Sequence, residues 1–207
     1  MYVNGMHKLQ CLLFDLDDTL VDSDPLRIEA LKQCGHPDPA SLHLEELRFK
    51  SPPALMKPHC GINMNQYWKQ YISAAEKHAQ LTSNKLPLVL AQLKSTGKKL
   101  GVVTSSPGRI AYSVLSIVKL IEFFDSCLIG YEHFKRNKKN GIIKALLKLN
   151  ISPEVTGYIG DSIHDRKASD MASVCFFLAS WNRRILKEKS IKKEANVIKD
   201  VEDLLTL

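Results

Sequence analysis

A cluster of carboxylates follows the first apolar run of the chain. The stretch LLFDLDDTLVDSDP, residues 12–25, holds five aspartates within ten residues, at positions 15, 17, 18, 22 and 24. Partly buried carboxylates this close repel one another strongly unless a cation lies among them. Two carboxylates two residues apart can also divide the work of a reaction, because one can attack as a nucleophile while the other moves a proton. Asp15 and Asp17 are the predicted catalytic pair.

Two other short stretches carry side chains that could complete such a site. Thr104-Ser105-Ser106 and Gly160-Asp161-Ser162-Ile163-His164-Asp165 each follow an apolar run. If Asp161 converges with the first two acids, a hard divalent ion resolves their repulsion, and all-oxygen ligation with few carboxylates suits Mg²⁺, which also binds phosphate oxygens. The predicted metal ligands are Asp15, Asp17 and Asp161, and the predicted substrate contacts are Thr104, Ser105 and a lysine.

The elements that position these residues are predicted to alternate. Apolar runs that end in polar residues indicate five buried strands, and amphipathic segments of helical period separate them, with Gly97 as a helix stop. This alternation predicts an α/β fold with a doubly wound parallel sheet, in which reacting groups gather at the carboxyl ends of the strands. The strands are expected within residues 9–17, 98–106, 125–132, 156–162 and 173–180, and helices within 86–97, 109–124 and 140–150.

One segment breaks the alternation. Residues 21–85 show no strand pattern but several helical ones, at 25–35, 41–49 and 63–81, with prolines at the joints. We therefore expect a small α-helical cap domain at 21–85, inserted after the first strand into a core domain formed by residues 1–20 and 86–207.

Composition excludes several classes of protein. The chain has 207 residues, of which 44% are hydrophobic and 25% charged, as in a globular domain. Five cysteines without a CxxC pair indicate a reducing, cytoplasmic setting, and no apolar run is long enough for a membrane span. The net charge of +7 is concentrated in two basic blocks, 135–148 and 182–193, which lack the aromatic residues that stack on bases, so nucleic acid is not the expected partner.

Three motifs together resemble one known family. FDLDDTLVDS (14–23), GVVTSSP (101–107) and GYIGDSIHD (157–165) are similar, in order, to the first, second and fourth motifs of haloacid dehalogenase-like (HAD) hydrolases. With the predicted helical cap, the resemblance is to the phosphoglycolate phosphatase and beta-phosphoglucomutase-like group. It implies a Rossmann-like core and a magnesium-dependent phosphatase that acts on a small phosphomonoester.

The resemblance also implies a role for each matching residue. Asp15 matches the nucleophile that forms an aspartyl-phosphate, and Asp17 matches the general acid and base, which contacts the metal through its backbone carbonyl. Asp161 matches a direct magnesium ligand. Thr104 matches the hydroxyl that binds the phosphoryl group, and Asp165 matches a second acid that supports the metal shell.

The third motif of the family, a lysine that offsets the charge of the aspartate and phosphate, is not fixed by the sequence. The basic run FKRNKKNG lacks the usual lysine-proline pair. Lys138 is the preferred choice, and Lys139, Arg136 and Lys135 are the alternatives, because the loop length before the helix decides which side chain points inward.

Other functions of the same fold stay open at this stage. A dehalogenase would not need Asp17, and a phosphonate hydrolase would need a Schiff-base lysine in the cap. A sugar-phosphate mutase would use the same two aspartates, so the sequence does not separate it from a phosphatase. A binding module without activity, using the basic blocks, is the alternative from another class. Asp24, Arg27, Tyr67 and Trp68 are cap residues that could contact the leaving group, although the two aromatics also fit a cap core.

Overall fold

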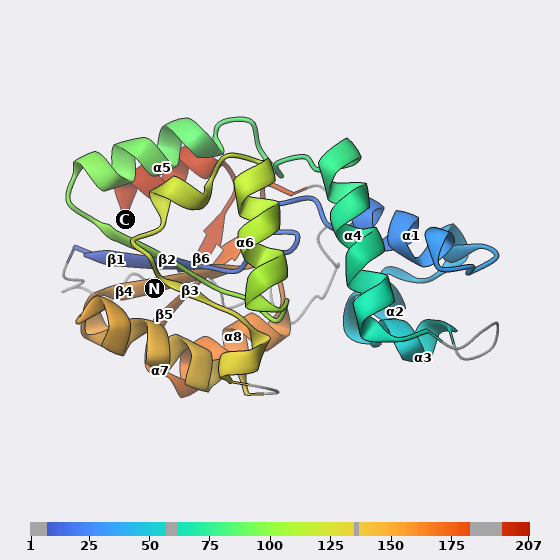
Figure 1. Cartoon of the computed structure of the whole chain (residues 1–207). Coiled ribbons are helices and arrows are strands. Elements are labelled where there is room, and N and C mark those ends of the chain that lie inside the picture. Colours follow the sequence, from blue (N-terminus) through green and yellow to red (C-terminus); the bar gives the residue numbers. More distant parts are fainter. Residues whose placement is uncertain (1–7, 57–61, 135–136, 183–195) are drawn as a thin grey trace.

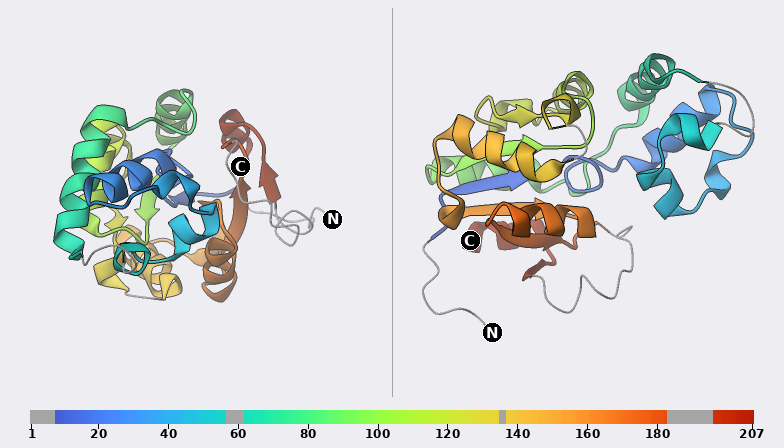
Figure 2. Two further views of the ribbon diagram at one scale, coloured as in Figure 1. Left: turned by 90° about the vertical axis from the view of Figure 1, so that its right-hand side faces the viewer. Right: turned by 90° about the horizontal axis from the view of Figure 1, so that it is seen from below.

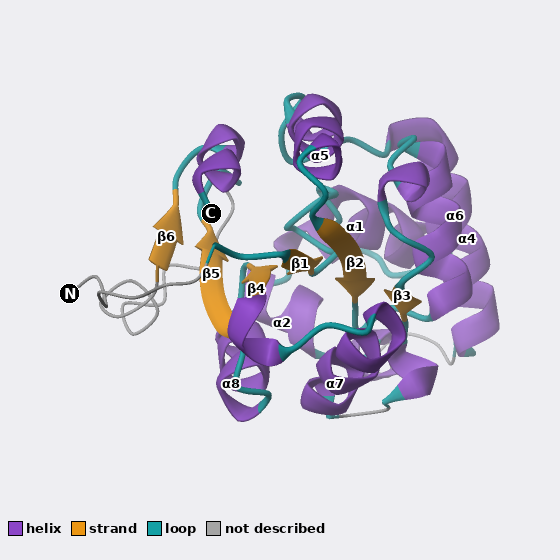
Figure 3. Cartoon of the chain, turned by 90° about the vertical axis from the view of Figure 1, so that its left-hand side faces the viewer, coloured by secondary structure: helices purple, strands orange, loops and turns teal. Residues whose placement is uncertain are grey.

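The central element of the structure is a parallel β-sheet with helices on both faces. The computed structural model describes residues 8–56, 62–134, 137–182 and 196–207. Over these residues the sheet has six strands in the order β3-β2-β1-β4-β5-β6, all parallel (Figure 3). The strands are β1 (Cys11–Phe14), β2 (Lys99–Val103), β3 (Leu128–Ile129), β4 (Thr156–Gly160), β5 (Cys175–Ala179) and β6 (Asn196–Ile198).

Helices cover the two faces of this sheet. In Figure 1, α5 (Leu86–Ser95) and α6 (Gly108–Ile117) lie on one face, and α7 (Lys138–Leu149) and α8 (Ile163–Met171) lie on the other. The side chains of β1 alternate accordingly. Leu12 and Phe14 belong to the apolar cluster beneath α5 and α6, whereas Cys11 and Leu13 belong to the cluster beneath α7 and α8. The predicted α/β architecture is confirmed.

Four helices form a separate group beside the sheet. They are α1 (Asp24–Gln33), α2 (Leu44–Phe49), α3 (Pro52–Met56) and α4 (Met64–His78). Figures 1 and 2 show them together, beyond the end of the strands where the candidate residues lie. We call this group the helical unit.

The two chain segments that join the helical unit to the sheet run side by side. Val21 forms an isolated antiparallel bridge with Leu81, the Asp22 amide donates to the Gln80 carbonyl at 2.9 Å, and the Thr82 amide donates to the Leu20 carbonyl at 3.1 Å. The entry and exit of the unit are thus tied together at one narrow joint.

The structure differs from the sequence-based prediction in a few elements. Strand β6 and helices α3 and α8 are absent from the predicted elements; β6 and α3 are short, and β6 has two exposed residues out of three. The helix expected over residues 109–124 ends at Ile117, because Lys119 adopts a left-handed φ of 58°. Gly97, predicted as a helix stop, has a φ of 81° just after α5. Over the described residues, no helix has the length and apolar character needed to cross a membrane.

Candidate active site

The strand ends bring the predicted residues to one edge of the sheet. Phe14 of β1 pairs with Val102 of β2 and with Ile159 of β4, so the residues that follow these strands are neighbours. A cavity of about 120 Å³ lies there. Its lining comes from both the sheet and the helical unit: Asp15, Asp17, Asp18, Arg27, Arg48, Ser105, Lys138, Asp161, Ser162, His164 and Asp165.

A wider hollow lies elsewhere, against α7 and the turn that follows it. Its volume is about 500 Å³, and its lining includes Ile143, Leu147 and Pro153 but no ionisable side chain. It offers no group for acid, base or metal chemistry, so the smaller cavity at the strand ends is the candidate site.

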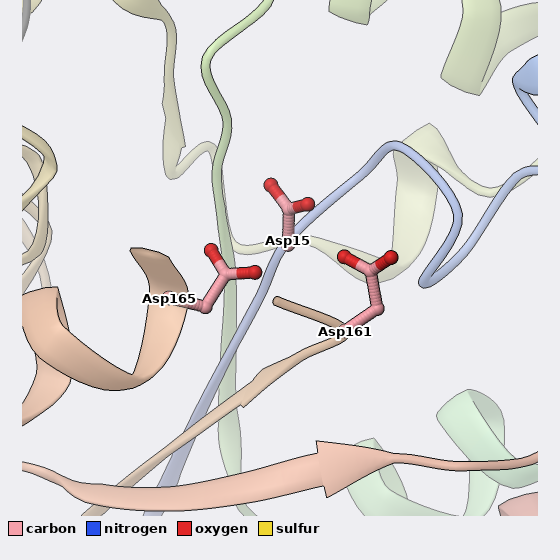
Figure 4. A group of neighbouring side chains, drawn as sticks. All are labelled: Asp15, Asp161 and Asp165. Atoms are coloured by element: carbon pink, nitrogen blue, oxygen red, sulfur yellow. The ribbon is translucent and has the colours of Figure 1, made fainter. Parts of the chain in front are cut away.

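Three buried carboxylates form the centre of this site (Figure 4). Asp15, Asp161 and Asp165 each offer an oxygen atom, and these atoms lie within 4.8 Å of one another. The residues come from the end of β1, the end of β4 and the first turn of α8. Three buried acids at this separation strongly disfavour full ionisation without added positive charge.

Lys138 supplies part of that charge. Its Nζ donates to Oδ1 of Asp15 at 2.7 Å and to Oδ1 of Asp165 at 2.5 Å. Burial alone would lower the pKa of Lys138, but the two carboxylates outweigh it and raise this pKa well above its ordinary value. Lys138 is the first residue of α7, where the helix dipole disfavours a cation, so its position is explained by these two acids.

Asp165 is held firmly by the start of α8. Its Oδ2 accepts hydrogen bonds from the Ser162 amide at 3.2 Å and the Ser162 hydroxyl at 2.6 Å, and the Asp165 amide donates back to Ser162 Oγ. This is a capping box, with Ser162 as the N-cap. Both oxygens of Asp165 are therefore engaged, one by Lys138 and one by Ser162, which fits a residue that positions the lysine.

Asp17 lies in a different environment from Asp15. Its carboxylate accepts hydrogen bonds from the Ser106 hydroxyl at 2.7 Å and the Tyr71 hydroxyl at 3.2 Å, and it lies 3.3 Å from Nη2 of Arg27. Burial would raise the pKa of Asp17, but the Arg27 charge and the hydrogen bonds outweigh it and lower this pKa. Two carboxylates two residues apart are thus held in opposite electrostatic settings.

Asp15 and Asp161 are hard to ionise. Burial, with the neighbouring Asp165 and Asp17 adding to it and Lys138 opposing it, raises the pKa of Asp15 to about 7. Burial and the charges of Asp165 and Asp15 raise the pKa of Asp161 well above its ordinary value, although Arg48 opposes the shift. A divalent cation would remove this penalty, and a donor set made only of oxygens fits Mg²⁺.

The remaining predicted contacts fall as follows. Thr104 is fully buried, and its hydroxyl lies 3.4 Å from Oδ2 of Asp17 and accepts from the Ser106 amide at 3.0 Å. Ser105 is exposed and lines the cavity. Lys139 is half-buried and is not part of the lining. Lys135, Arg136 and nearly all of the second basic block lie outside the described residues.

Residues of the helical unit reach further into the site than the sequence predicted. Arg48 lines the cavity and donates to Asp161 at 3.1 Å, and Tyr71 and the core residue Ser106 both contact Asp17. No motif spacing identifies Arg48 or Tyr71. Tyr67 and Trp68 instead pack edge to face, with ring centroids 4.9 Å apart, and are absent from the cavity lining.

Most of the chain matches one family of enzymes. Residues 12–179 match the family model described as haloacid dehalogenase-like hydrolase. The chain belongs to this family. The match includes most of β1, the helical unit and all three sequence motifs, so the predicted membership is confirmed and the protein is an enzyme of the haloacid dehalogenase-like hydrolase family.

Similar proteins cover nearly the whole chain. Pyrophosphatase PpaX of Bacillus velezensis is 27% identical over 209 residues, which are 96% of this chain and 95% of the relative. Phosphoglycolate phosphatase of Aquifex aeolicus is 27% identical and covers 84% of this chain and 85% of its own. A haloacid dehalogenase-like hydrolase from Streptococcus pneumoniae has the same fold, with a TM-score of 0.75, 20% identity, and coverage of 96% and 97%.

Proposed function

We propose that this enzyme is a magnesium-dependent phosphatase that hydrolyses a small phosphomonoester through a phospho-aspartate on Asp15. The observation that carries the proposal is the lysine bridge. Lys138 joins Asp15 to Asp165 beside Asp161, while Asp17, two residues from Asp15, is held by a separate set of partners. This arrangement supports Asp15 as the nucleophile and Asp17 as the general acid and base.

Asp15 is the proposed nucleophile. A carboxylate oxygen of Asp15 attacks phosphorus, and the bond from phosphorus to the leaving oxygen breaks, which leaves an acyl phosphate on the protein. Lys138 holds Oδ1 of Asp15 and offsets the charge that gathers on the phosphoryl oxygens. Thr104 and Ser105 are the proposed hydroxyl contacts of the phosphoryl group.

Asp17 is the proposed general acid and base. Its low pKa makes it a carboxylate in the resting site, and a phosphate dianion placed beside it would raise that pKa by like-charge repulsion, so that it can carry a proton. Asp17 then gives this proton to the leaving oxygen. In the second step it takes a proton from water, whose oxygen attacks phosphorus and releases phosphate and Asp15.

Asp15 and Asp161, with the main-chain carbonyl of Asp17, are the proposed holders of Mg²⁺. When bound, the ion would supply positive charge to the phosphoryl oxygens. The raised pKa values of both side chains support this assignment, because these acids lack enough positive charge in their surroundings. Asp165 stays a predicted support of the metal shell through Lys138.

Residues 21–85 are the proposed cap domain over a core of residues 1–20 and 86–207. Arg27 and Arg48 of the helical unit line the same cavity as Asp15, which supports a site that closes over its substrate. A cavity of about 120 Å³ favours a small phosphorylated metabolite. The names of the two relatives make pyrophosphate and phosphoglycolate the first substrates to test.

The two alternatives differ from a phosphatase in different ways. A sugar-phosphate mutase would return an isomeric sugar phosphate, whereas a phosphatase releases free phosphate. A nucleic-acid-binding module would use the basic blocks. In the block at 135–148, Lys138 points into the site and Lys144 donates to the His133 carbonyl, so these two lysines have partners within the protein. Cytoplasmic location stays a prediction.

The test is phosphate release from a panel containing pyrophosphate, phosphoglycolate and hexose phosphates, with magnesium or with EDTA. The native protein is compared with Asp15→Asn and with Asp170→Asn, an exposed acid of α8 that serves as the matched control. We expect magnesium-dependent release that Asp15→Asn abolishes and Asp170→Asn keeps. Absence of release from every substrate by folded, magnesium-treated protein would contradict the proposal.

A further inference from the structure

Arg48 links the helical unit to the acidic centre of the site. It lies on α2, and its side chain is 4% exposed. Nη2 donates to Asp24 at 2.6 Å, Nη1 donates to Oδ2 of Asp161 at 3.1 Å, and Nε lies 3.4 Å from Oδ2 of Asp18. One guanidinium therefore contacts both an acid of its own unit and an acid at the end of β4.

The contact with Asp161 uses a carboxylate that the proposed function assigns to magnesium. A guanidinium keeps its charge at every pH that proteins tolerate, so it cannot give way by losing a proton. Two positive centres on one carboxylate repel each other strongly in a buried site. The geometry therefore places Arg48 where it opposes a cation at Asp161.

We propose that Arg48 and Mg²⁺ compete for Asp161, so that metal occupancy is coupled to the position of α2. This inference rests on the proposed function, which supplies the metal. Without metal, the ion pair between Arg48 and Asp161 neutralises the carboxylate and helps to hold α2 against the core. With metal at Asp161, this ion pair is weakened and α2 becomes more mobile.

The neighbouring ion pairs determine which part would loosen. Asp24 lies on α1, within the helical unit, so Arg48 stays attached to its own unit when it leaves Asp161. Arg27, also on α1, contacts the core loop independently, through Asp18 at 2.6 Å and Asp17 at 3.3 Å. The Arg48 contact with Asp161 is therefore the one that metal would remove, while the Arg48 contacts with Asp24 and Asp18 and both contacts of Arg27 remain.

Magnesium affinity of the full chain, measured by titration calorimetry at pH 8, tests the competition. Arg48→Met removes the charge and keeps most of the apolar stem. The control is Lys50→Met, which removes a charge next to the same helix from an exposed side chain paired with Glu46. We expect Arg48→Met to bind Mg²⁺ about tenfold more tightly than the native protein, and Lys50→Met to match the native protein.

Hydrogen exchange gives a second readout that needs no variant. Adding Mg²⁺ to the native protein should speed exchange of the amides at residues 47–50, two of which donate within or next to α2, and leave those of α1 unchanged. Arg48→Met should show fast exchange there with or without metal.

The outcomes separate this inference from the proposed function. Weaker or unchanged magnesium binding in Arg48→Met, or exchange at α2 that magnesium slows or leaves unaltered, would overturn the competition while the phosphatase proposal stands. If Arg48→Met does not fold, the native exchange experiment alone decides. No magnesium uptake by the native protein would overturn both.

Discussion

At the scale of single residues, two nearby carboxylates of the site differ in pKa because they contact different parts of the chain. Asp15 and Asp17 are two residues apart, yet one is bound by Lys138 of α7 and the other by Ser106, Tyr71 and Arg27. Burial raises the pKa of Asp15, whereas the charge of Arg27 and the hydrogen bonds lower that of Asp17. Pairs of acids pushed in opposite directions are typical of sites where one attacks and the other transfers protons.

The lysine bridge gives the residue-scale prediction. Lys138→Met should lower kcat by about 10²–10³-fold, because it removes the charge that faces Asp15 and the phosphoryl oxygens. Lys139→Met, the adjacent residue outside the cavity lining, should leave kcat nearly unchanged. Steady-state kinetics with the substrate found in the panel would check this, and equal losses in the two variants would contradict the role of Lys138.

Residues of the site differ in how well the sequence predicts them. Asp15, Thr104 and Asp161 follow apolar strands, and parallel strands end at a shared edge, so their proximity follows from the pattern. For the lysine, the sequence predicts Lys138 but leaves three alternatives, because only the start of α7 decides which side chain points inward. Arg48 and Tyr71 carry no such signal, since their reach depends on how the helical unit sits against the sheet.

At the scale of elements, the loop after β1 connects the sheet to the helical unit through buried charges. Asp18 has a left-handed φ of 64°, which a residue with a side chain adopts at some cost. Its carboxylate accepts from Arg27 at 2.6 Å and from the Ser23 amide at 3.1 Å. These contacts offset the cost of an aspartate in this left-handed conformation.

The element-scale prediction concerns that carboxylate. Asp18→Asn keeps the shape and tolerates the backbone conformation, but it leaves Arg27 and Arg48 with one buried anion fewer, so we expect a loss of about 2–4 kcal/mol in the free energy of unfolding. Asp170→Asn, whose partner Arg166 lies on the surface, should change it by less than about 0.5 kcal/mol. Urea denaturation measures both free energies. An Asp18→Asn protein as stable as the native protein would argue against a stabilising role for the buried ion pairs of Asp18 with Arg27 and Arg48.

Most strands were predicted from their apolar runs, including the two-residue β3, whereas β6 and α3 were not. The runs that became β1, β2, β4 and β5 form strands of four or five residues, nearly all of them buried. Strand β6 has three residues and helix α3 has five, so neither provides enough periodicity. The early end of α6 arises from one left-handed residue, Lys119, which nothing in the amphipathic pattern marks.

At the scale of the whole molecule, the acidic centre links stability to pH and metal. In the metal-free protein the pKa of Asp15 is about 7, above its ordinary value of 3.8, and that of Asp161 is raised in the same direction. The folded state therefore holds protons that the unfolded state releases. The stability that these groups contribute is present below the ordinary pKa and is lost as the pH rises through the folded-state pKa.

Thermal unfolding in EDTA should show this dependence. We expect Tm to fall between pH 5.5 and pH 8.5 by at least about 3 °C, which corresponds to about 1 kcal/mol for a chain of this size. Magnesium should restore Tm at the higher pH, and Asp15→Asn should flatten the profile. A Tm that rises over this pH range in EDTA, or that does not change when magnesium is added, would conflict with the proposed metal site.

The measurement that tests the central claim most directly is a search for the phosphoryl group on Asp15. The enzyme, magnesium and the best substrate are mixed, quenched in acid within the first turnover, digested, and examined by mass spectrometry. The account predicts a phosphorylated peptide that carries Asp15, present with the native protein and absent with Asp15→Asn. Phosphate release without any phosphorylated protein, or a phosphoryl group on another residue, would contradict it.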